Sequence, residues 1–260
     1  MGIKTVITKG ELPLKYKEFN LIETKDGLTH SVYLLENKYV LKIVEDTTQE
    51  AILNEQKLLE NLEILCVPKL LDIYKKDNNT MVFYTQMCGK SIVEPTIFHI
   101  KQIAVFLKEF HSISKNLSSS NKKIYNKKYL KNLILQTKEP LFLNYFNTIH
   151  CEFKNDGVIH GDLFCDNAKF KDDILSGVFD FIEACEGDFV FDLAVVALSW
   201  CYEKDMLNEK KVQILLDSYG LDIDIKEFKS YIKYALLYYT TTRYLNNRDY
   251  KELLKRLKNL

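Results

Sequence analysis

Three side chains with oxygen donors stand at spacings that suit phosphoryl transfer. Asp162 and Asn167 lie five residues apart in one polar segment, and Asp180 follows a short apolar run. Phosphoryl transfer needs a carboxylate near the attacking hydroxyl and metal ions on the phosphate oxygens. Mg²⁺ takes oxygen ligands of this kind. We therefore predict that Asp162 is the catalytic base and that Asn167 and Asp180 bind Mg²⁺.

The surrounding pattern predicts elements that bring these side chains together. A short apolar strand at 158–159 precedes a loop at 160–167, and a β-hairpin over 168–179 ends at Asp180. Taken singly, each candidate could be an ordinary turn residue, because Asp and Asn favour turns. Their combination around one hairpin favours chemistry. We expect His160 to brace the loop backbone instead of transferring protons.

The same motifs resemble those of the aminoglycoside phosphotransferase, choline kinase and homoserine kinase superfamily. The resemblance is carried by Gly-Val-Ile-His-Gly-Asp-Leu-Phe-Cys-Asp-Asn at 157–167 and Gly-Val-Phe-Asp-Phe at 177–181. The kinase-like homoserine kinases are more similar still. They share Asp-Leu-Phe-x-Asp-Asn, Ala-Cys after the metal Asp, the Asp-Leu-Ala helix ending in Trp-Cys at 192–201, and the aromatic segment 235–244.

This resemblance implies an α+β, protein-kinase-like two-lobe fold with a β-rich N-lobe and a mainly helical C-lobe. The pattern agrees, because strands are indicated at 31–35, 38–44, 70–74 and 81–86, with a helix from a Thr47–Glu50 capping box to about Leu62. Helical periodicity dominates from residue 97 onward. We expect a nucleotide-binding lobe over 1–88 and a catalytic and acceptor-binding lobe over 89–260.

A lysine in an apolar strand suggests a buried anion. Lys42 shares a strand face with Val40 and Val44, and the kinase interpretation supplies the α- and β-phosphates of ATP as its partner. Glu55, at helical spacing with apolar neighbours, is the carboxylate expected to orient the ammonium. The alternatives are a surface lysine on an edge strand, and Glu50 in place of Glu55.

The remaining nucleotide contacts are less clearly marked in the sequence. Residues 26–31 hold one glycine where a glycine-rich loop would cradle phosphates, so Gly27, Thr29 and Ser31 are the candidates. A hinge between the two lobes is expected near residues 87–91. Gln86 and Cys88, beside it, complete the expected nucleotide site.

The acceptor is expected to be small. Only eleven residues separate Asp180 from Asp192, no Ala-Pro-Glu follows, and Phe164 stands where a protein kinase has a lysine. No platform for a peptide is left. Asp192 is expected to bond the catalytic loop or to cap a helix starting at Leu193.

One arginine points to the kind of acceptor. Arg243 joins the apolar face of its predicted helix, where a guanidinium suits a carboxylate such as that of homoserine. An internal ion pair is the alternative. Glu183, together with Glu186 and Asp188, could bind the amine of homoserine or a wholly cationic acceptor. Homoserine is the best guess for the acceptor. The alternative acceptors are choline, ethanolamine and an aminoglycoside. A further alternative is that the protein is a catalytically silent kinase-like binding module.

Composition narrows the class of protein further. The 260 residues are 47% hydrophobic, and 36 Lys and Arg balance 36 Asp and Glu, so the basic footprint of a nucleic-acid binder is missing. No signal or membrane-spanning pattern is visible, so we expect a cytoplasmic protein without a membrane partner. A monomer or a homodimer is expected. The six scattered cysteines predict free thiols, and the polar stretch 117–128 predicts an exposed linker.

Overall fold

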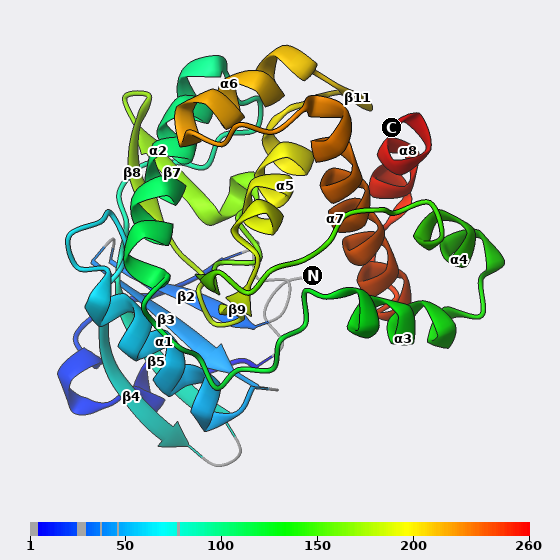
Figure 1. Cartoon of the computed structure of the whole chain (residues 1–260). Coiled ribbons are helices and arrows are strands. Elements are labelled where there is room, and N and C mark those ends of the chain that lie inside the picture. The colour runs from blue at the N-terminus through cyan, green and yellow to red at the C-terminus, as the bar shows by residue number, and fades with distance from the viewer. Residues whose placement is uncertain (1–4, 25–29, 37, 46, 77–78) are drawn as a thin grey trace. The chain divides into compact units, whose positions relative to one another are not determined.

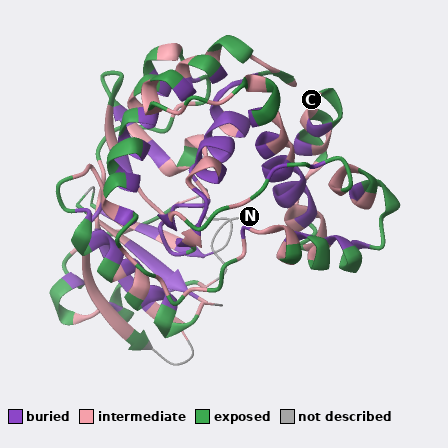
Figure 2. Ribbon diagram, viewed as in Figure 1, coloured by how far each residue is buried: buried purple, intermediate pink, exposed green. Residues whose placement is uncertain are grey.

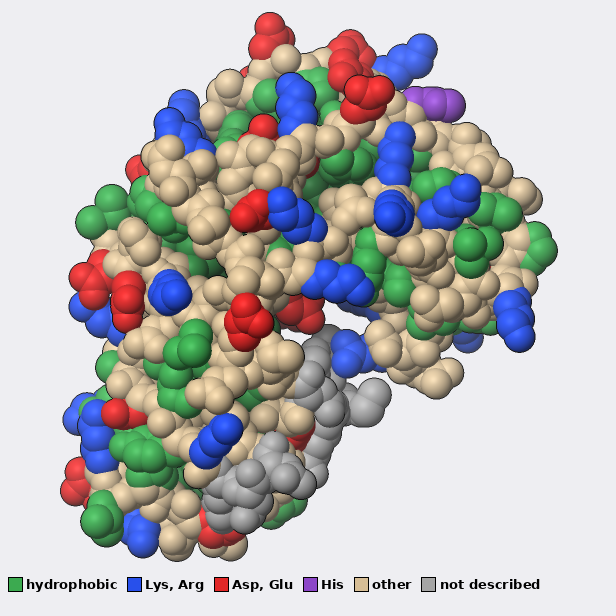
Figure 3. Space-filling view, turned by 60° about the horizontal axis from the view of Figure 1, so that its bottom comes forward, with side chains coloured by type: hydrophobic (Ala, Val, Ile, Leu, Met, Phe, Trp, Pro, Cys, Tyr) green, Lys and Arg blue, Asp and Glu red, His purple; other side chains and the backbone are tan. Residues whose placement is uncertain are grey.

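The computed structural model describes residues 5–24, 30–36, 38–45, 47–76 and 79–260. The chain divides into two compact units, Met1–Cys88 and Gly89–Leu260, whose elements are labelled in Figure 1. Within the described residues, no helix is both long and apolar enough to cross a membrane. Basic and acidic side chains are scattered together over the face shown in Figure 3.

The first unit is a five-stranded antiparallel sheet with one long helix. The strand order is β1-β2-β3-β5-β4. The strands are β1 (Leu21–Glu23), β2 (Ser31–Leu35), β3 (Tyr39–Val44), β4 (Leu70–Lys76) and β5 (Asn79–Thr85). The helices are α1 (Gln49–Asn61) and the short 3₁₀ turns η1 (Lys9–Glu11) and η2 (Leu14–Tyr16).

Side-chain alternation along the strands builds the core of this unit. Tyr33, Leu41 and Phe83 are buried in one cluster, against which the Tyr16 ring stacks on Phe83 with centroids 3.8 Å apart. Because successive strand residues point to opposite faces, Lys42 lies on the other face of β3 from Leu41. That strand lies between β2 and β5, so the edge-strand alternative for Lys42 is wrong.

The N-cap of helix α1 is Thr48, one residue after the expected cap Thr47. Thr48 has extended backbone angles, and its side chain accepts a hydrogen bond from the Ala51 N–H. The capping box predicted between Thr47 and Glu50 is therefore wrong. An N-cap residue needs non-helical backbone angles and a side-chain oxygen within reach of the first turn. Thr47 and Thr48 both have the hydroxyl, so the backbone conformation decides which of them caps the helix.

The second unit is mainly helical, with short strand pairs around the loop at 160–167. Its helices are α2 (Ile97–Ser114), α3 (Lys127–Thr137), α4 (Pro140–Phe146), η3 (Cys165–Asn167), α5 (Phe189–Trp200), α6 (Glu209–Tyr219), α7 (Ile225–Leu245) and α8 (Lys251–Asn259). Its strands pair as β6 (Gly157–Ile159) with β9 (Cys185–Gly187), β7 (Ala168–Lys171) with β8 (Ile174–Val178), and β10 (Tyr202–Glu203) with β11 (Met206–Leu207). This α+β architecture confirms the predicted fold class.

Helix α5 is the central element of this unit. It packs on α2, α6 and α7, and Figure 2 shows it buried along most of its length. It begins at Phe189, four residues before the predicted start, because the Asp188 carboxylate accepts from the Val190 N–H and caps it. Asp192 therefore lies inside the first turn and is free of any capping role.

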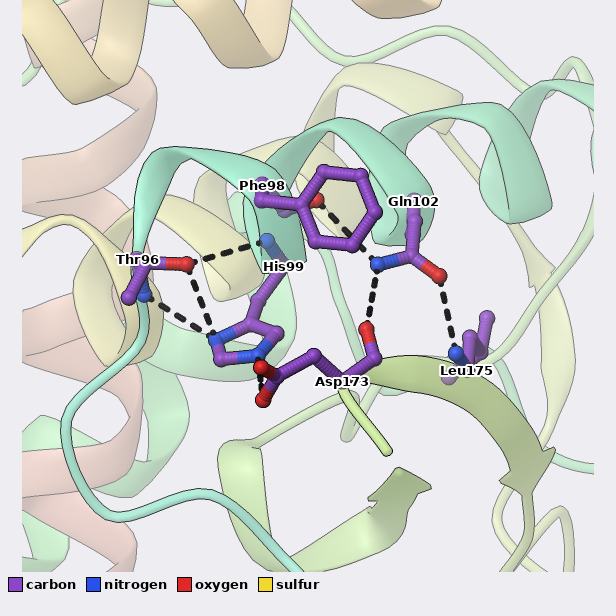
Figure 4. Close-up of polar contacts among 6 residues, drawn as sticks. All are labelled: Thr96, Phe98, His99, Gln102, Asp173 and Leu175. Atoms are coloured by element: carbon purple, nitrogen blue, oxygen red, sulfur yellow. Dashed lines mark hydrogen bonds and ion pairs between the residues drawn. The ribbon is translucent and has the colours of Figure 1, made fainter. Parts of the chain in front are cut away.

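The β7–β8 hairpin, which joins Asn167 to Asp180, is docked on α2 (Figure 4). The Gln102 amide donates to the Asp173 carbonyl at 2.8 Å and accepts from the Leu175 N–H at 2.8 Å. Nε2 of His99 lies 3.3 Å from Oδ1 of Asp173. Helix α2 thus holds the turn of the hairpin and the start of β8.

The polar stretch before α3 is more than an exposed linker. Tyr125 is buried, with 3% of its surface exposed, and its ring stacks on Phe191 at 4.6 Å. Asn121 donates to the carbonyls of Ile182 and Ala184, just after Asp180. The prediction of an exposed linker at 117–128 is wrong here, because hydrogen bonds to backbone carbonyls let polar residues cover the interior.

Replacing Gln102 by Ala should loosen the hairpin, because both hydrogen bonds between its side chain and the hairpin would be lost. We expect the free energy of unfolding to fall by about 1–2 kcal/mol, measured by urea denaturation. Lys101→Ala, an exposed position on the same helix, is the control and should change stability little. Equal effects of the two variants would contradict the docking role.

Candidate active site

The loop at 160–167 is irregular, so its backbone groups need partners outside regular structure. The buried Asp192 carboxylate accepts from the His160 N–H at 2.8 Å and from the Gly161 N–H at 2.7 Å. Its Oδ2 also lies 3.0 Å from Nε2 of His111. Of the two predicted roles for Asp192, the structure bears out the first, which is to bond the catalytic loop.

Two further side chains at the end of α5 hold the same loop. Nε1 of Trp200 donates to the Leu163 carbonyl at 3.0 Å. Oγ of Ser199 accepts from the Cys165 N–H at 3.0 Å. The loop is therefore bonded to one face of α5 along its length, and both ends of that helix contribute.

His160 braces the loop, as expected. Its Nδ1 accepts from the Asp162 N–H at 3.2 Å, and its Nε2 lies 3.1 Å from the Phe179 carbonyl. This pairing requires a neutral ring with the proton on Nε2. Burial lowers the pKa of His160, which favours that neutral form.

Asp162 and Asn167 are in direct contact. Nδ2 of Asn167 donates to the main-chain carbonyl of Asp162 at 2.7 Å and to its Oδ2 at 3.2 Å. Burial raises the pKa of Asp162 well above its ordinary value, and the negative charges of Glu183 and Asp180 raise it further. Asp180 is thus close enough for its charge to act on Asp162.

Asp180 lies two residues after the end of β8 and has a left-handed backbone, at φ +71°. Few residues other than glycine adopt this region, and Asp is among those that tolerate it. The donor set suits a divalent cation. Because Nδ2 of Asn167 donates to Asp162, its Oδ1 is the oxygen left to accompany the Asp180 carboxylate. Two hard oxygen donors from a loop and a strand end fit Mg²⁺.

The three acidic residues after Asp180 do not form one pocket. Asp188 is buried at the N-terminus of α5, where its second oxygen accepts from the Lys154 N–H. Glu186 forms an ion pair with Lys123 at 2.5 Å. Glu183 is exposed and close enough to raise the pKa of Asp162. The acidic pocket predicted from all three is therefore wrong, and Glu183 alone remains a candidate for an amine.

Arg243 reaches the catalytic loop through an aromatic ring. Its guanidinium carbon lies 5.7 Å from the centre of the Phe164 ring, two residues after Asp162. Arg243 is half-buried and makes no ion pair or hydrogen bond with its side chain among the described residues. The alternative of an internal ion pair is therefore not observed within the described part of the chain.

In the first unit, Lys42 and Glu55 are both buried, with 8% and 2% of their surfaces exposed. Oε2 of Glu55 accepts from the Tyr84 hydroxyl at 2.7 Å, which anchors α1 to β5. The alternative carboxylate, Glu50, is exposed. Inward-facing Lys42 and Glu55 agree with the sequence pattern.

The other nucleotide candidates differ in how they are used. Gly27 and Thr29 lie outside the described residues. Ser31 is wholly buried, and its hydroxyl donates to Glu45 at 2.8 Å and accepts from the Thr5 N–H, which argues against a phosphate contact. Oε1 of Gln86 is buried without a partner among the described residues, and the Cys88 thiol is exposed.

Two tyrosines contact this loop that sequence reasoning did not assign to it. The Tyr239 hydroxyl donates to the Gly161 carbonyl. Tyr125 packs so closely on Gly161, whose φ is +79°, that a Cβ there would overlap the phenol ring. Tyr125 lies in the stretch predicted as an exposed linker and Tyr239 in the aromatic segment 235–244, and no local spacing marks either, because their partner is far away in the sequence.

Helix side chains hold a loop that carries an Asp–Asn pair, and a second Asp follows a hairpin. This arrangement is the one expected of the kinase-like phosphotransferases. The chain belongs to the phosphotransferase enzyme family, abbreviated APH, whose model matches residues 21–220. It is a small-molecule phosphotransferase that acts on a hydroxyl acceptor, and the predicted superfamily is confirmed.

Curated relatives are homoserine kinases. The enzyme of Bartonella henselae is 24% identical over 244 residues, which cover 84% of this chain and 75% of that kinase. The enzyme of Azorhizobium caulinodans is 52% identical over 64 residues, which cover 24% of this chain and only 20% of that kinase. High identity is thus confined to a short segment.

Solved structures share the fold at low identity. The GDP and kanamycin complex of APH(2")-IIia has a TM-score of 0.70 and 17% identity, over 92% of this chain and 91% of that one. A choline/ethanolamine kinase family protein from Mesorhizobium loti has a TM-score of 0.70 and 12% identity, over 96% and 90%. Both establish the two-lobe kinase-like fold.

Replacing Gly161 by Ala should disturb Asp162, the candidate base, directly. The matched control is Gly220→Ala, since Gly220 also has positive φ (+88°) and a Cβ there would meet only the flexible end of Lys108 at 3.2 Å. The positive φ by itself should cost about 1 kcal/mol of stability in each variant, and Gly161→Ala should cost more because its Cβ overlaps the ring of buried Tyr125.

Gly161→Ala should in addition lower kcat about a hundredfold, because small displacements of a catalytic group have effects of that order. Steady-state kinetics and thermal melts of both variants test this. Similar kcat values would show that the Tyr125–Gly161 contact has no bearing on the reaction.

Proposed function

We propose that this protein is a homoserine kinase that transfers the γ-phosphate of ATP to the side-chain hydroxyl of homoserine. Asp162 accepts the hydroxyl proton, and Asn167 and Asp180 hold Mg²⁺. Bound there, the metal supplies positive charge to the phosphate oxygens. Residues 1–88 bind the nucleotide, and residues 89–260 carry the base and the acceptor site.

The nucleotide half of the proposal rests on buried polar groups in the first unit. Lys42 is a buried cation on β3, which lies inside the sheet between β2 and β5. We assign it to the α- and β-phosphates, with Glu55 orienting the ammonium. The buried Oε1 of Gln86 is an acceptor suited to the amino group of adenine.

The acceptor half rests on one observation, which is the half-buried Arg243 guanidinium with no carboxylate partner among the described residues. A guanidinium binds a carboxylate through two parallel hydrogen bonds. Homoserine carries a carboxylate, an amine and a primary hydroxyl. Arg243 then binds the carboxylate, exposed Glu183 binds the amine, and the hydroxyl lies at Asp162.

Asp162→Asn should lower kcat by a factor of about 10²–10⁴, because positioned general bases contribute that much. ATP binding should be retained, since Asp162 is not assigned to the nucleotide. Asp222→Asn, the same change at an exposed position, is the control. A variant with undiminished kcat in a coupled ADP-release assay would remove Asp162 as the base.

The choice of acceptor is tested by a panel of substrates in the same assay. We expect turnover with L-homoserine to exceed turnover with 3-aminopropan-1-ol, choline, ethanolamine and kanamycin. The comparison with 3-aminopropan-1-ol is the sharpest, because it differs from homoserine only by the missing carboxylate. Preference for any acceptor without a carboxylate would rule out homoserine.

Arg243→Lys should raise the KM for homoserine about tenfold, because a bidentate contact becomes a single point charge. The KM values for ATP and for 3-aminopropan-1-ol should stay near those of the unmodified enzyme. An equal rise in the KM for ATP would instead assign Arg243 to the nucleotide or to the fold.

A further inference from the structure

The peptide unit just before the candidate base is held at both ends. The Gly161 carbonyl accepts from the Tyr239 hydroxyl, and the Asp162 N–H donates to Nδ1 of His160 at 3.2 Å. These two groups belong to one planar peptide. Its orientation sets the direction in which the Asp162 side chain leaves the loop, and Tyr239 is therefore placed to align it.

The same tyrosine supports the residue that follows the base. The Tyr239 and Phe164 rings meet edge to face, with centroids 4.8 Å apart and an interplanar angle of 87°. The Phe164 backbone is bonded to both sides of the site. Its N–H donates to the Asp162 carbonyl at 2.8 Å, and its carbonyl accepts from the Asn167 N–H at 3.0 Å.

Arg243 lies on the same face of α7 as Tyr239, because residues four apart in a helix are neighbours. Its guanidinium lies over the Phe164 ring. Tyr239, Phe164 and Arg243 thus form one continuous contact from the proposed carboxylate site to the peptide that carries the base. Tyr239 is 8% exposed, so its ring has little freedom to move apart from this contact.

We propose that Tyr239 and Phe164 are positioning residues that couple binding of the acceptor carboxylate at Arg243 to alignment of Asp162. This inference rests on the proposed function. When the acceptor carboxylate binds, it fixes the position of the Arg243 guanidinium, which in turn restricts the Phe164 ring. The Phe164 ring then keeps the loop and Tyr239 in place relative to each other. Binding energy from a group remote from the reaction is then expressed in kcat.

The experiment compares kcat for L-homoserine and 3-aminopropan-1-ol in the unmodified enzyme and in Tyr239→Phe. We expect Tyr239→Phe to lower kcat with homoserine about tenfold, the effect of one lost hydrogen bond. The loss with 3-aminopropan-1-ol should be smaller, so the ratio of the two kcat values falls. The KM for ATP should stay unchanged.

Tyr238→Phe is the matched control, because it removes the same hydroxyl from the adjacent buried residue. The Tyr238 ring packs on Tyr125 and Phe191, and its hydroxyl has no hydrogen-bond partner among the described residues. Its kcat values should match those of the unmodified enzyme. Unchanged kcat in Tyr239→Phe, or an equal loss with both acceptors, would overturn the coupling.

Two outcomes need separate readings. If Tyr239→Phe melts before the assay temperature, Phe164→Leu keeps an apolar side chain without the flat ring, and an unchanged ratio in that variant overturns the proposal. If the unmodified enzyme prefers 3-aminopropan-1-ol, the proposed acceptor and the coupling to a carboxylate both fail. The alignment of Asp162 by Tyr239 is then judged by kcat on that acceptor alone.

Discussion

The buried Asp192 carboxylate is the interaction on which the rest of the site depends. The loop that carries the candidate base has only the short 3₁₀ turn η3 as regular structure. Asp192 accepts from two of its successive N–H groups and also faces His111. A carboxylate buried in an otherwise apolar helix is tolerated only when its oxygens are well bonded. The loop and the helix therefore stabilise each other.

The site is built from elements that flank the loop in space, although α2 precedes the loop in the sequence and α5 and α7 follow it. Helix α5 bonds the loop through Asp192, Ser199 and Trp200. Helix α7 contacts it through Tyr239, which donates to the Gly161 carbonyl and packs on the Phe164 ring of the loop. The hairpin that leads to Asp180 is held by α2. A loop with little structure of its own gains a defined geometry because three helices restrain it.

Several charged side chains near the site are used to hold the fold together, and this bears on which residues could bind an acceptor. Asp188 and Glu186 look as suitable as Glu183 in the sequence, yet one caps a helix and the other pairs with Lys123. Arg256 similarly bonds Glu252 and the Leu198 carbonyl at the end of α5. Arg243 has no such partner among the described residues, which distinguishes it for recognition.

The sequence by itself determined the features that depend on near neighbours. Strand alternation around Lys42, helical periodicity along α2 and the Asp162, Asn167 and Asp180 spacing were all readable, because period and motif are local properties. The superfamily and the two-lobe fold are implied by the resemblance that the motifs at 157–167 and 177–181 carry, and the comparisons confirmed them.

Only the tertiary structure decided the features that depend on distant partners. The contact between Tyr239 and Gly161 spans 78 residues of chain, and Tyr125 is buried although its neighbours are polar. The cap of α1 and the start of α5 depended on backbone angles that the fold imposes. A local pattern shows which groups can form hydrogen bonds, whereas packing decides which partner each of them reaches.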